Sequence, residues 1–231
     1  IAQYGADIVR WWALSTDWRT DVRVGDEILQ RVAEAYRKVR NTFRFLLGNL
    51  HGFDPALDQV APADLVELDA WAIARTRELQ AEIITAYRDY AFHLIYQKVH
   101  NFCIVALGGL YLDVLKDRLY TTPAKSHARR SAQTAMLHIV EAMVRWLAPI
   151  LSFTAEEIWQ YLPGKRGESV QCELWHALPE VPASAIAWPA LLALRAAVTR
   201  ELEKLRDTGA IGAPLEAQVD VWCSPAEYPK L

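Results

Sequence analysis

The chain has 231 residues, of which 52% are hydrophobic, so it can bury a substantial core and is not intrinsically disordered. Its net charge of −3 argues against a uniformly cationic nucleic-acid-binding protein. The three cysteines are widely spaced and form no CxxC pair, which predicts buried thiols and indicates neither a zinc knuckle nor a disulfide framework.

The sequence carries no sign of a membrane segment or a secretion signal. No stretch approaches the roughly 20 uncharged apolar residues of a membrane helix. Arginines and aspartates run through the N-terminal region, which excludes a signal peptide. We therefore expect a soluble, cytoplasmic protein without a membrane partner. The chain starts at Ile1 and not at Met, which suggests a fragment of a longer protein.

Helical periodicity dominates the first two thirds of the chain. Apolar residues recur at three- and four-residue spacing in most of these segments. Residues 92–119 are apolar almost all round in their middle, which predicts the central helix. Thr154 and Glu157 have capping-box spacing and predict the start of another helix, which ends at Pro163. The predicted helices form a bundle and span residues 26–50, 68–90, 92–119, 131–148 and 154–162.

The chain changes character after Pro163. Residues 164–189 contain turn residues and prolines with little periodicity, which predicts a long connector. A helix is predicted near residues 190–207. Apolar and polar residues then alternate in residues 217–223, which predicts a half-buried strand. Because a single strand needs partners, we expect this part to be the beginning of a small α+β domain.

No pattern for self-contained catalysis is present. The sequence lacks a phosphate-binding glycine loop, a dinucleotide fingerprint, a zinc-protease histidine pair and a nucleophile elbow. Its six histidines are scattered, and packed or surface roles are favoured for His93 and His100 over metal binding. We predict no catalytic residue, no metal site and no cofactor for these residues.

Charge is distributed unevenly along the chain. Residues 10–44 and residues 113–131 carry an excess of bases, whereas residues 54–90 carry an excess of acids. A fold that brings the two basic stretches together would present one cationic face and one acidic face. Such a molecule is compatible with a polyanion bound on one side.

Six segments carry a resemblance to a known family. They are, in order, YGADIVRWW, DVRVGDEIL, YRKVRNTFRFLLGNL, YLDVLKDRLYT, RRSAQTAMLHI and APILSFTAEEIWQYLPG. With these segments the chain resembles the C-terminal part of bacterial isoleucyl-tRNA synthetases, which are class I aminoacyl-tRNA synthetases, and the resemblance covers essentially its whole length. The YGAD segment with its following Arg10 is shared by the isoleucyl, valyl, leucyl and methionyl enzymes, whereas LDVLKDRLYT and VRVGDEIL resemble the isoleucyl enzyme.

The resemblance implies a mainly α fold in three parts. Residues 1–27 would end the fold that contacts the stem of the tRNA and joins the catalytic domain to the helical domain. Residues 28–163 would be the helical anticodon-binding bundle of the class I synthetase type. Residues 164–231 would be the connector and the start of the C-terminal junction domain, the small α+β domain.

The resemblance also implies an activity that this chain alone should lack. The intact enzyme ligates isoleucine to its tRNA, and it uses ATP with magnesium and a structural zinc. The His-Ile-Gly-His and Lys-Met-Ser-Lys-Ser motifs that hold ATP do not occur here, nor do the editing domain and the zinc-binding cysteines. The expected partner is isoleucine tRNA and not DNA, and the expected state is a monomer.

The triplet Lys116, Asp117 and Arg118 is the first candidate for RNA binding. If the helix ends near Leu119, the two cations lie in its last turn. There they interact favourably with the helix dipole, which would explain them without any functional role. Asp117 has the wrong sign for that explanation. Donors and an acceptor near a tyrosine can instead read the exposed bases of an RNA loop, which the resemblance favours, with Lys116 as the first choice for a base contact.

Two arginine groups are the second set of candidates. Residues of the segment YRKVRNTFRF form a polar stripe at helical spacing, which is either a solvated face or a set of phosphate contacts along the anticodon stem. An arginine pair near residue 130 has the same two interpretations. The candidates in these two groups are Arg37, Arg40, Asn41 and Arg44, and Arg129 and Arg130.

Two alternatives stay open from the sequence. The chain could be the equivalent region of a valyl-tRNA synthetase. It could also be a helical scaffold that binds another protein and no RNA, which the net acidity favours. Salt dependence of tRNA binding separates RNA recognition from the scaffold, because phosphate contacts weaken steeply as salt rises.

Overall fold

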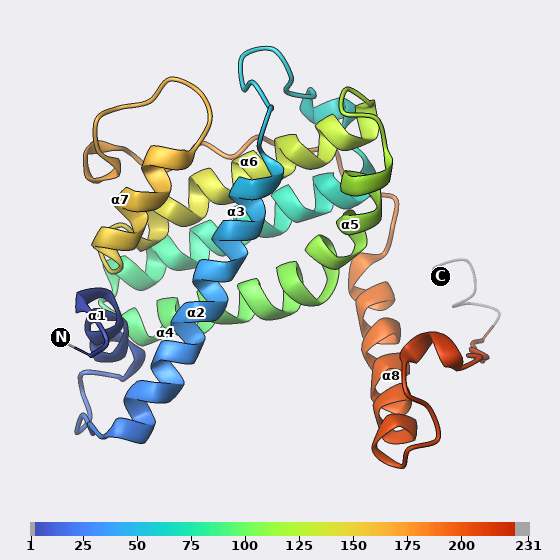
Figure 1. Cartoon of the computed structure of the whole chain (residues 1–231), viewed down its shortest axis with the longest axis horizontal. Coiled ribbons are helices and arrows are strands. Elements are labelled where there is room, and N and C mark those ends of the chain that lie inside the picture. Colours follow the sequence, from blue (N-terminus) through green and yellow to red (C-terminus); the bar gives the residue numbers. More distant parts are fainter. Residues whose placement is uncertain (1–2, 225–231) are drawn as a thin grey trace. The chain divides into compact units, whose positions relative to one another are not determined.

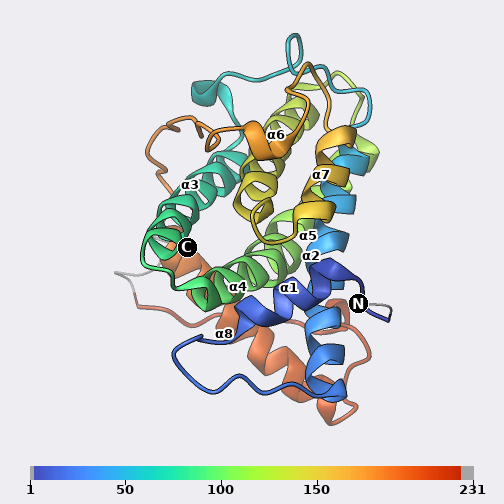
Figure 2. The ribbon, with the colours of Figure 1, turned by 90° about the vertical axis from the view of Figure 1, so that its left-hand side faces the viewer.

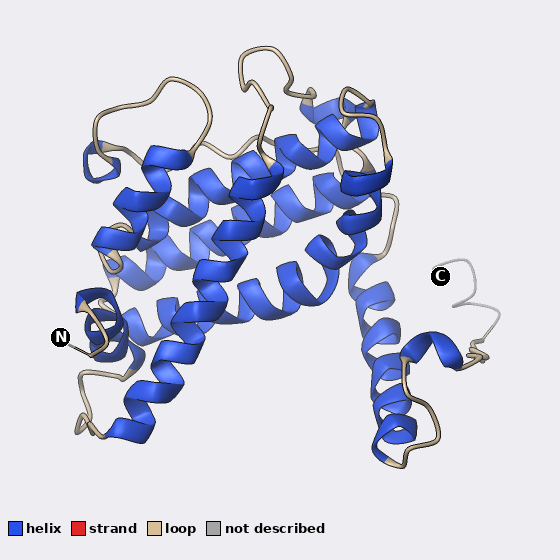
Figure 3. Cartoon of the chain, viewed as in Figure 1, coloured by secondary structure: helices blue, strands red, loops and turns tan. Residues whose placement is uncertain are grey.

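The computed structural model describes residues 3–224, and the regular structure in that range is helical throughout (Figures 1 and 3). Most residues between Asp26 and Tyr161 belong to helices, and the longest connection between two of them covers residues 50–66. Within residues 3–224, three single-turn 3₁₀ helices occupy Pro62–Asp64, Val170–Cys172 and Pro214–Glu216. The longer helices are α1 (Ala6–Ser15), α2 (Asp26–Asn49), α3 (Glu67–Arg88), α4 (Phe92–Asn101), the π-helix η2 (Phe102–Tyr111), α5 (Leu112–Thr121), α6 (His127–Leu147), α7 (Ser152–Tyr161) and α8 (Trp188–Asp207).

The chain divides into two compact units, Ile1–Pro182 and Ala183–Leu231. The first unit holds α1 to α7 and the connector up to Pro182, and it confirms the predicted helical bundle. In the second unit, α8 confirms the helix predicted near residues 190–207. None of the residues of α8 is buried.

The strand predicted over residues 217–223 is wrong. The described part of the second unit holds a 3₁₀ turn at Pro214–Glu216 and irregular backbone after it, and Val219 and Val221 are each 45% exposed. Alternating residues form a strand only when a neighbouring strand satisfies their backbone groups. The described residues of this unit supply no such neighbour, so the α+β part of the predicted fold is not seen.

The most buried element of the bundle is α6, and not the run of residues 92–119. Fourteen residues of α6 are buried, among them the polar Ser131, Gln133 and Thr134. α6 packs along α3 and also contacts α2, α5 and α7. The predicted central helix exists as the continuous helical run from α4 through η2 to α5, but Val105 and Val114 on it are 62% and 53% exposed.

This helical run, Phe92–Thr121, is long and apolar enough to cross a membrane by length and composition alone. Its uncharged part lies between Lys98 and Asp113, and 44% of its most apolar window is buried inside the structure. The expectation that no segment approaches membrane-helix length therefore has one exception among the described residues. A core helix of a soluble protein meets the same criterion.

The middle of the run winds as a π-helix, which is rarely this long. At Gly108 the wider winding brings the backbone close to the Cys103 carbonyl oxygen, and an added Cβ would lie 2.9 Å from that oxygen. A side chain at residue 108 would therefore push against the backbone of the preceding turn. The sequence signal for this feature is the Gly108-Gly109 pair in an otherwise apolar helix.

Two residues of the YGADIVR segment form hydrogen bonds between α1 and the rest of the bundle. Buried Asp7 accepts hydrogen bonds from the Thr154 backbone N–H at 2.7 Å and from the Thr154 hydroxyl at 2.6 Å, and so caps α7. Arg10 donates to the carbonyls of Pro149 and Ile150, each at 2.7 Å. The predicted capping box is thus replaced by a cap from a distant helix. Figure 2 shows α1 lying near α2 and α4, on which it packs.

Candidate functional site

The end of α5 carries the predicted triplet, and its three members lie in different environments. Lys116 and Asp117 are exposed, whereas Arg118 points inward and its side chain is 16% exposed. Lys116 donates to Asp113 at 2.9 Å, and this contact raises the pKa of the lysine. Tyr120 is 66% exposed beside them. Lys116, Asp117 and Tyr120 therefore form an outward-facing polar surface at the end of α5.

Arg118 forms an internal ion pair. Its guanidinium donates to both carboxylate oxygens of Asp69, at 2.8 and 2.9 Å. Asp69 is fully buried near the start of α3 and also accepts from Tyr111 at 2.9 Å and from Ser131 at 2.5 Å. Burial and the nearby Asp69 carboxylate hold the pKa of Tyr111 well above its ordinary value. The Arg118 guanidinium is thus engaged by Asp69 in the interior of the bundle.

The polar stripe on α2 is exposed as predicted. Arg37, Asn41 and Arg44 are exposed and form no hydrogen bond or ion pair with the described side chains. Arg40 differs, because its guanidinium donates to both oxygens of Glu157 on α7, each at 2.7 Å. This hydrogen bonding raises the pKa of Arg40 and lowers that of Glu157. A phosphate bound at Arg40 must therefore compete with Glu157.

A cleft of about 750 Å³ opens beside this stripe between α2 and α7. Tyr161, at the end of α7, is 72% exposed on its edge. The cleft joins cationic and amide groups to an aromatic side chain, which suits an unstacked base and its phosphate. Among the lining residues that the sequence analysis did not select for RNA binding are His51, Phe53, Glu157 and Tyr161. The polar residues of the lining are Arg40, Asn41, Arg44, His51 and Glu157.

Arg129 and Arg130, at the start of α6, are largely internal. Arg130 is 13% exposed, pairs with Asp58 at 3.1 Å, and lies over the Phe53 ring at 5.7 Å from its centroid. Arg129 is half-buried, and its backbone N–H is capped by the Ser126 hydroxyl at 3.4 Å. The geometry of Arg130 favours a structural role over a phosphate contact.

The predicted separation into a cationic face and an acidic face is not realised at these arginines. Two acids of the stretch 54–90 form ion pairs with these arginines, Asp69 with Arg118 and Asp58 with Arg130. The basic stretch of residues 113–131 is thereby partly neutralised inside the bundle. Sequence periodicity shows which face of a helix is polar, but not which distant acid will meet it, so these pairings had no sequence signal.

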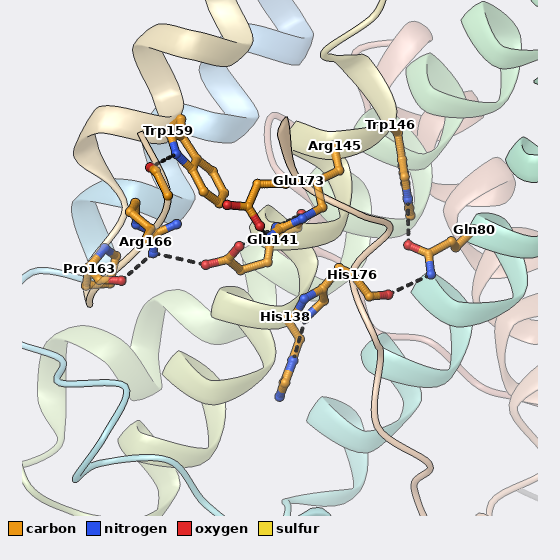
Figure 4. Close-up of polar contacts among 11 residues, drawn as sticks. Gln80, His138, Glu141, Arg145, Trp146, Trp159, Pro163, Arg166, Glu173 and His176 are labelled. Carbon is orange, nitrogen blue, oxygen red and sulfur yellow. Dashed lines mark hydrogen bonds and ion pairs between the residues drawn. The ribbon is translucent and has the colours of Figure 1, made fainter. Parts of the chain in front are cut away.

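A second polar cluster holds the connector against α6 (Figure 4). His138 Nδ1 lies 2.9 Å from His176 Nε2, which joins α6 to the connector. Burial lowers the pKa of both imidazoles, and that of His176 falls to about 4. Gln80 of α3 donates to the His176 carbonyl at 2.9 Å. Among the described residues there is no group of three His, Cys, Asp or Glu side chains placed to hold a metal ion.

Ion pairs continue this cluster toward α7. Glu141 pairs with Arg145 on its own helix and with Arg166 of the connector, the latter at 3.0 Å. The two guanidiniums lie near the Trp159 ring, 4.8 and 4.5 Å from its centroid. Burial alone would raise the pKa of Glu141, but the contacts with Arg145 and Arg166 lower it. The arrangement connects elements of the fold and presents no open nucleophile or acid–base pair.

Comparison with known proteins connects these features to one family. A family model described as the anticodon-binding domain of tRNA ligase matches residues 69–221. The chain is 58% identical to the isoleucine–tRNA ligase of Halorhodospira halophila over 96% of the chain. It is 55% identical to that of Nitrosococcus oceani over 98% of the chain and 57% identical to that of Thioalkalivibrio sulfidiphilus over 96%. It spans 24%, 25% and 24% of the lengths of these relatives.

Proposed function

Because the chain belongs to the anticodon-binding domain family of tRNA ligases, we propose that it recognises the anticodon arm of isoleucine tRNA within an isoleucine–tRNA ligase. The relatives described above are named isoleucine–tRNA ligases, and the chain corresponds to about a quarter of each. Ligation of isoleucine, the sites for ATP, magnesium and zinc, and the cytoplasmic location are thereby assigned to the longer protein. The division into residues 1–27, 28–163 and 164–231 belongs to the same proposal.

The observation that carries this proposal is the exposed stripe on α2 beside its cleft. Arg37 and Arg44 present free guanidiniums, and Asn41 between them offers a donor and an acceptor. Contacts of arginines with phosphates position an RNA and do not read its sequence. We assign general affinity to Arg37 and Arg44, whereas Arg40 contributes only after Glu157 is displaced.

Anticodon reading is assigned to the outer surface of α5. Lys116 has three donors on an exposed, flexible side chain, and Asp117 supplies acceptors one residue later. Unpaired loop bases expose the edges that such groups recognise. Arg118 supports this surface from inside and does not contact RNA.

The proposal is tested by binding of isoleucine tRNA and valine tRNA to the 231-residue chain at several salt concentrations. We expect preferential binding of isoleucine tRNA, with an affinity that falls steeply as salt rises because counterions are released from the phosphates. Footprinting should place the protection on the anticodon arm. No binding to either tRNA at low salt would support the protein scaffold, and equal binding of both would remove the assignment to isoleucine.

A further inference from the structure

The Asp69 carboxylate joins three separate elements of the bundle. It accepts four hydrogen bonds, two from Arg118 of α5, one from Tyr111 of η2 and one from Ser131 of α6. Ser131 in turn accepts from the Val66 backbone N–H at 2.9 Å, immediately before α3. Both oxygens of the fully buried carboxylate are therefore satisfied by neighbours of known position.

This network fixes the segment that carries the outer α5 surface. Arg118 lies within two residues of Lys116, Asp117 and Tyr120, and its side chain is held at two points by Asp69. At the end of α5 the Thr122 hydroxyl donates to the Arg118 carbonyl at 2.6 Å, and the Ser126 hydroxyl donates to the Thr122 hydroxyl at 3.1 Å. The orientation of the exposed residues thus depends on a buried contact with a different helix.

Stability alone is a poor explanation for this arrangement. Removing two charges from water carries a large free-energy cost, and well-packed apolar residues often stabilise a core equally well or better. A two-pronged arginine–carboxylate contact does supply geometric precision. Side chains that read bases require such precision, because supporting contacts must hold them close to their productive geometry.

We propose that Asp69 is a positioning residue for anticodon recognition, which acts through Arg118 to orient Lys116 and its neighbours on α5. The inference rests on the proposed function and deepens it. Asp69 itself is fully buried and touches no RNA. Arg118, which the sequence predicts as an RNA contact, instead connects Asp69 to the exposed residues of α5.

The test is a double-mutant cycle in the full-length ligase that contains this chain. Asp69→Asn, Lys116→Ala and their combination are compared for kcat/KM on isoleucine tRNA and on the same tRNA with an altered anticodon. We expect each single change to lower the ratio of the two values roughly tenfold, the scale of one lost base-edge contact. The double variant should lose no more than Lys116→Ala alone, because both changes remove one function. Isoleucyl-adenylate formation should not change.

Asp7→Asn is the matched control, since Asp7 is also a buried carboxylate that accepts several hydrogen bonds. It lies on α1, on the other side of the bundle from α5 (Figures 1 and 2). Asp7→Asn should lower the melting temperature and leave the ratio intact. If Asp69→Asn does not fold, Arg118→Lys replaces it in the cycle, because lysine keeps the charge without the two-pronged contact.

The outcomes separate this inference from the proposed function. If Lys116→Ala lowers the ratio while Asp69→Asn lowers only the melting temperature, the positioning role is wrong and anticodon recognition stands. Additive losses in the double variant would also overturn it, because Asp69 would then act by another route. If neither Lys116→Ala nor Arg44→Ala affects use of the tRNA, the proposed function itself fails.

Discussion

At the scale of single residues, the structure separates arginines that the sequence presents as equivalent. Arg37 and Arg44 are exposed, Arg40 shares its guanidinium with Glu157, and Arg118 and Arg130 pair with buried or half-buried acids. Helical spacing predicted the α2 stripe correctly, because periodicity defines a face. It could not distinguish Arg118 from Lys116, since the partner of Arg118 lies 49 residues away in the chain.

Arg44→Ala should weaken tRNA binding about equally for cognate and altered anticodons. The change removes a cation that faces solvent beside the cleft, so it affects phosphate contacts and leaves the fold intact. The slope of log affinity against log salt should fall by up to about one. Binding titrations at several salt concentrations measure this. A loss confined to one anticodon would instead make Arg44 a base-reading residue.

Glu157→Gln should increase the affinity for tRNA. The glutamine cannot hold Arg40 as an ion pair, so the guanidinium becomes available to a phosphate, and the salt slope should steepen by up to about one. Because both side chains are nearly half exposed, the pair contributes at most about 1 kcal/mol to stability. Thermal melts and binding titrations of the variant test both points. Unchanged affinity would show that Arg40 does not meet the RNA.

At the scale of elements, local patterns predicted the helices well and failed where a distant segment decides the structure. Periodicity and proline positions located the helices that become α2, α3, α6 and α8. The cap of α7 comes from Asp7, 147 residues earlier, so Thr154 and Glu157 mimicked a local capping box. The strand expected near Val219 lacks a pairing partner among the described residues. The greater burial of α6 depends on neighbours on several sides, which the amphipathic pattern of one helix does not reveal.

Gly108→Ala should destabilise the first unit. Its Cβ would lie 2.9 Å from the Cys103 carbonyl oxygen, and a backbone atom cannot rotate away as a side chain does. We expect a loss of about 1 to 3 kcal/mol in the free energy of unfolding, the usual cost of overpacking. Gly48→Ala is the control, because residue 48 is helical and has no atom within 4 Å of an added Cβ. Alanine there should stabilise by up to about 1 kcal/mol. Equal effects in urea unfolding would contradict the close approach at Gly108.

At the scale of the molecule, buried polar contacts between distant segments hold the first unit together. Asp7 joins α1 to α7, Asp69 joins α3 to η2, α5 and α6, and His138 joins α6 to the connector at His176. Each contact joins residues that are far apart in the sequence, on elements that also pack through apolar side chains. The long connector predicted after Pro163 is thus anchored up to residue 182 within the first unit.

The histidine contact predicts how stability depends on pH. In the unfolded chain both imidazoles have a pKa of about 6.5. In the folded chain burial lowers both values, and that of His176 to about 4. The unfolded state therefore binds more protons as the pH falls below 6.5, and acid favours unfolding. The stabilisation is fully present above pH 6.5 and is lost progressively toward pH 4, by up to about 3 kcal/mol for His176.

Urea unfolding of the chain between pH 7.5 and pH 5 measures this loss. The carboxylates with lowered pKa values, Glu82, Glu141 and Glu157, stay ionised in the folded protein over that range, so the histidines dominate the change. His176→Gln should be less stable at pH 7.5 and should show a flatter dependence on pH, because glutamine does not titrate. His51→Gln, at an exposed histidine outside the cluster, should keep the dependence of the parent chain. If His176→Gln also retained the full dependence, the protonation of other groups would account for acid sensitivity, and His176 would serve only as a neutral hydrogen-bonding partner of His138.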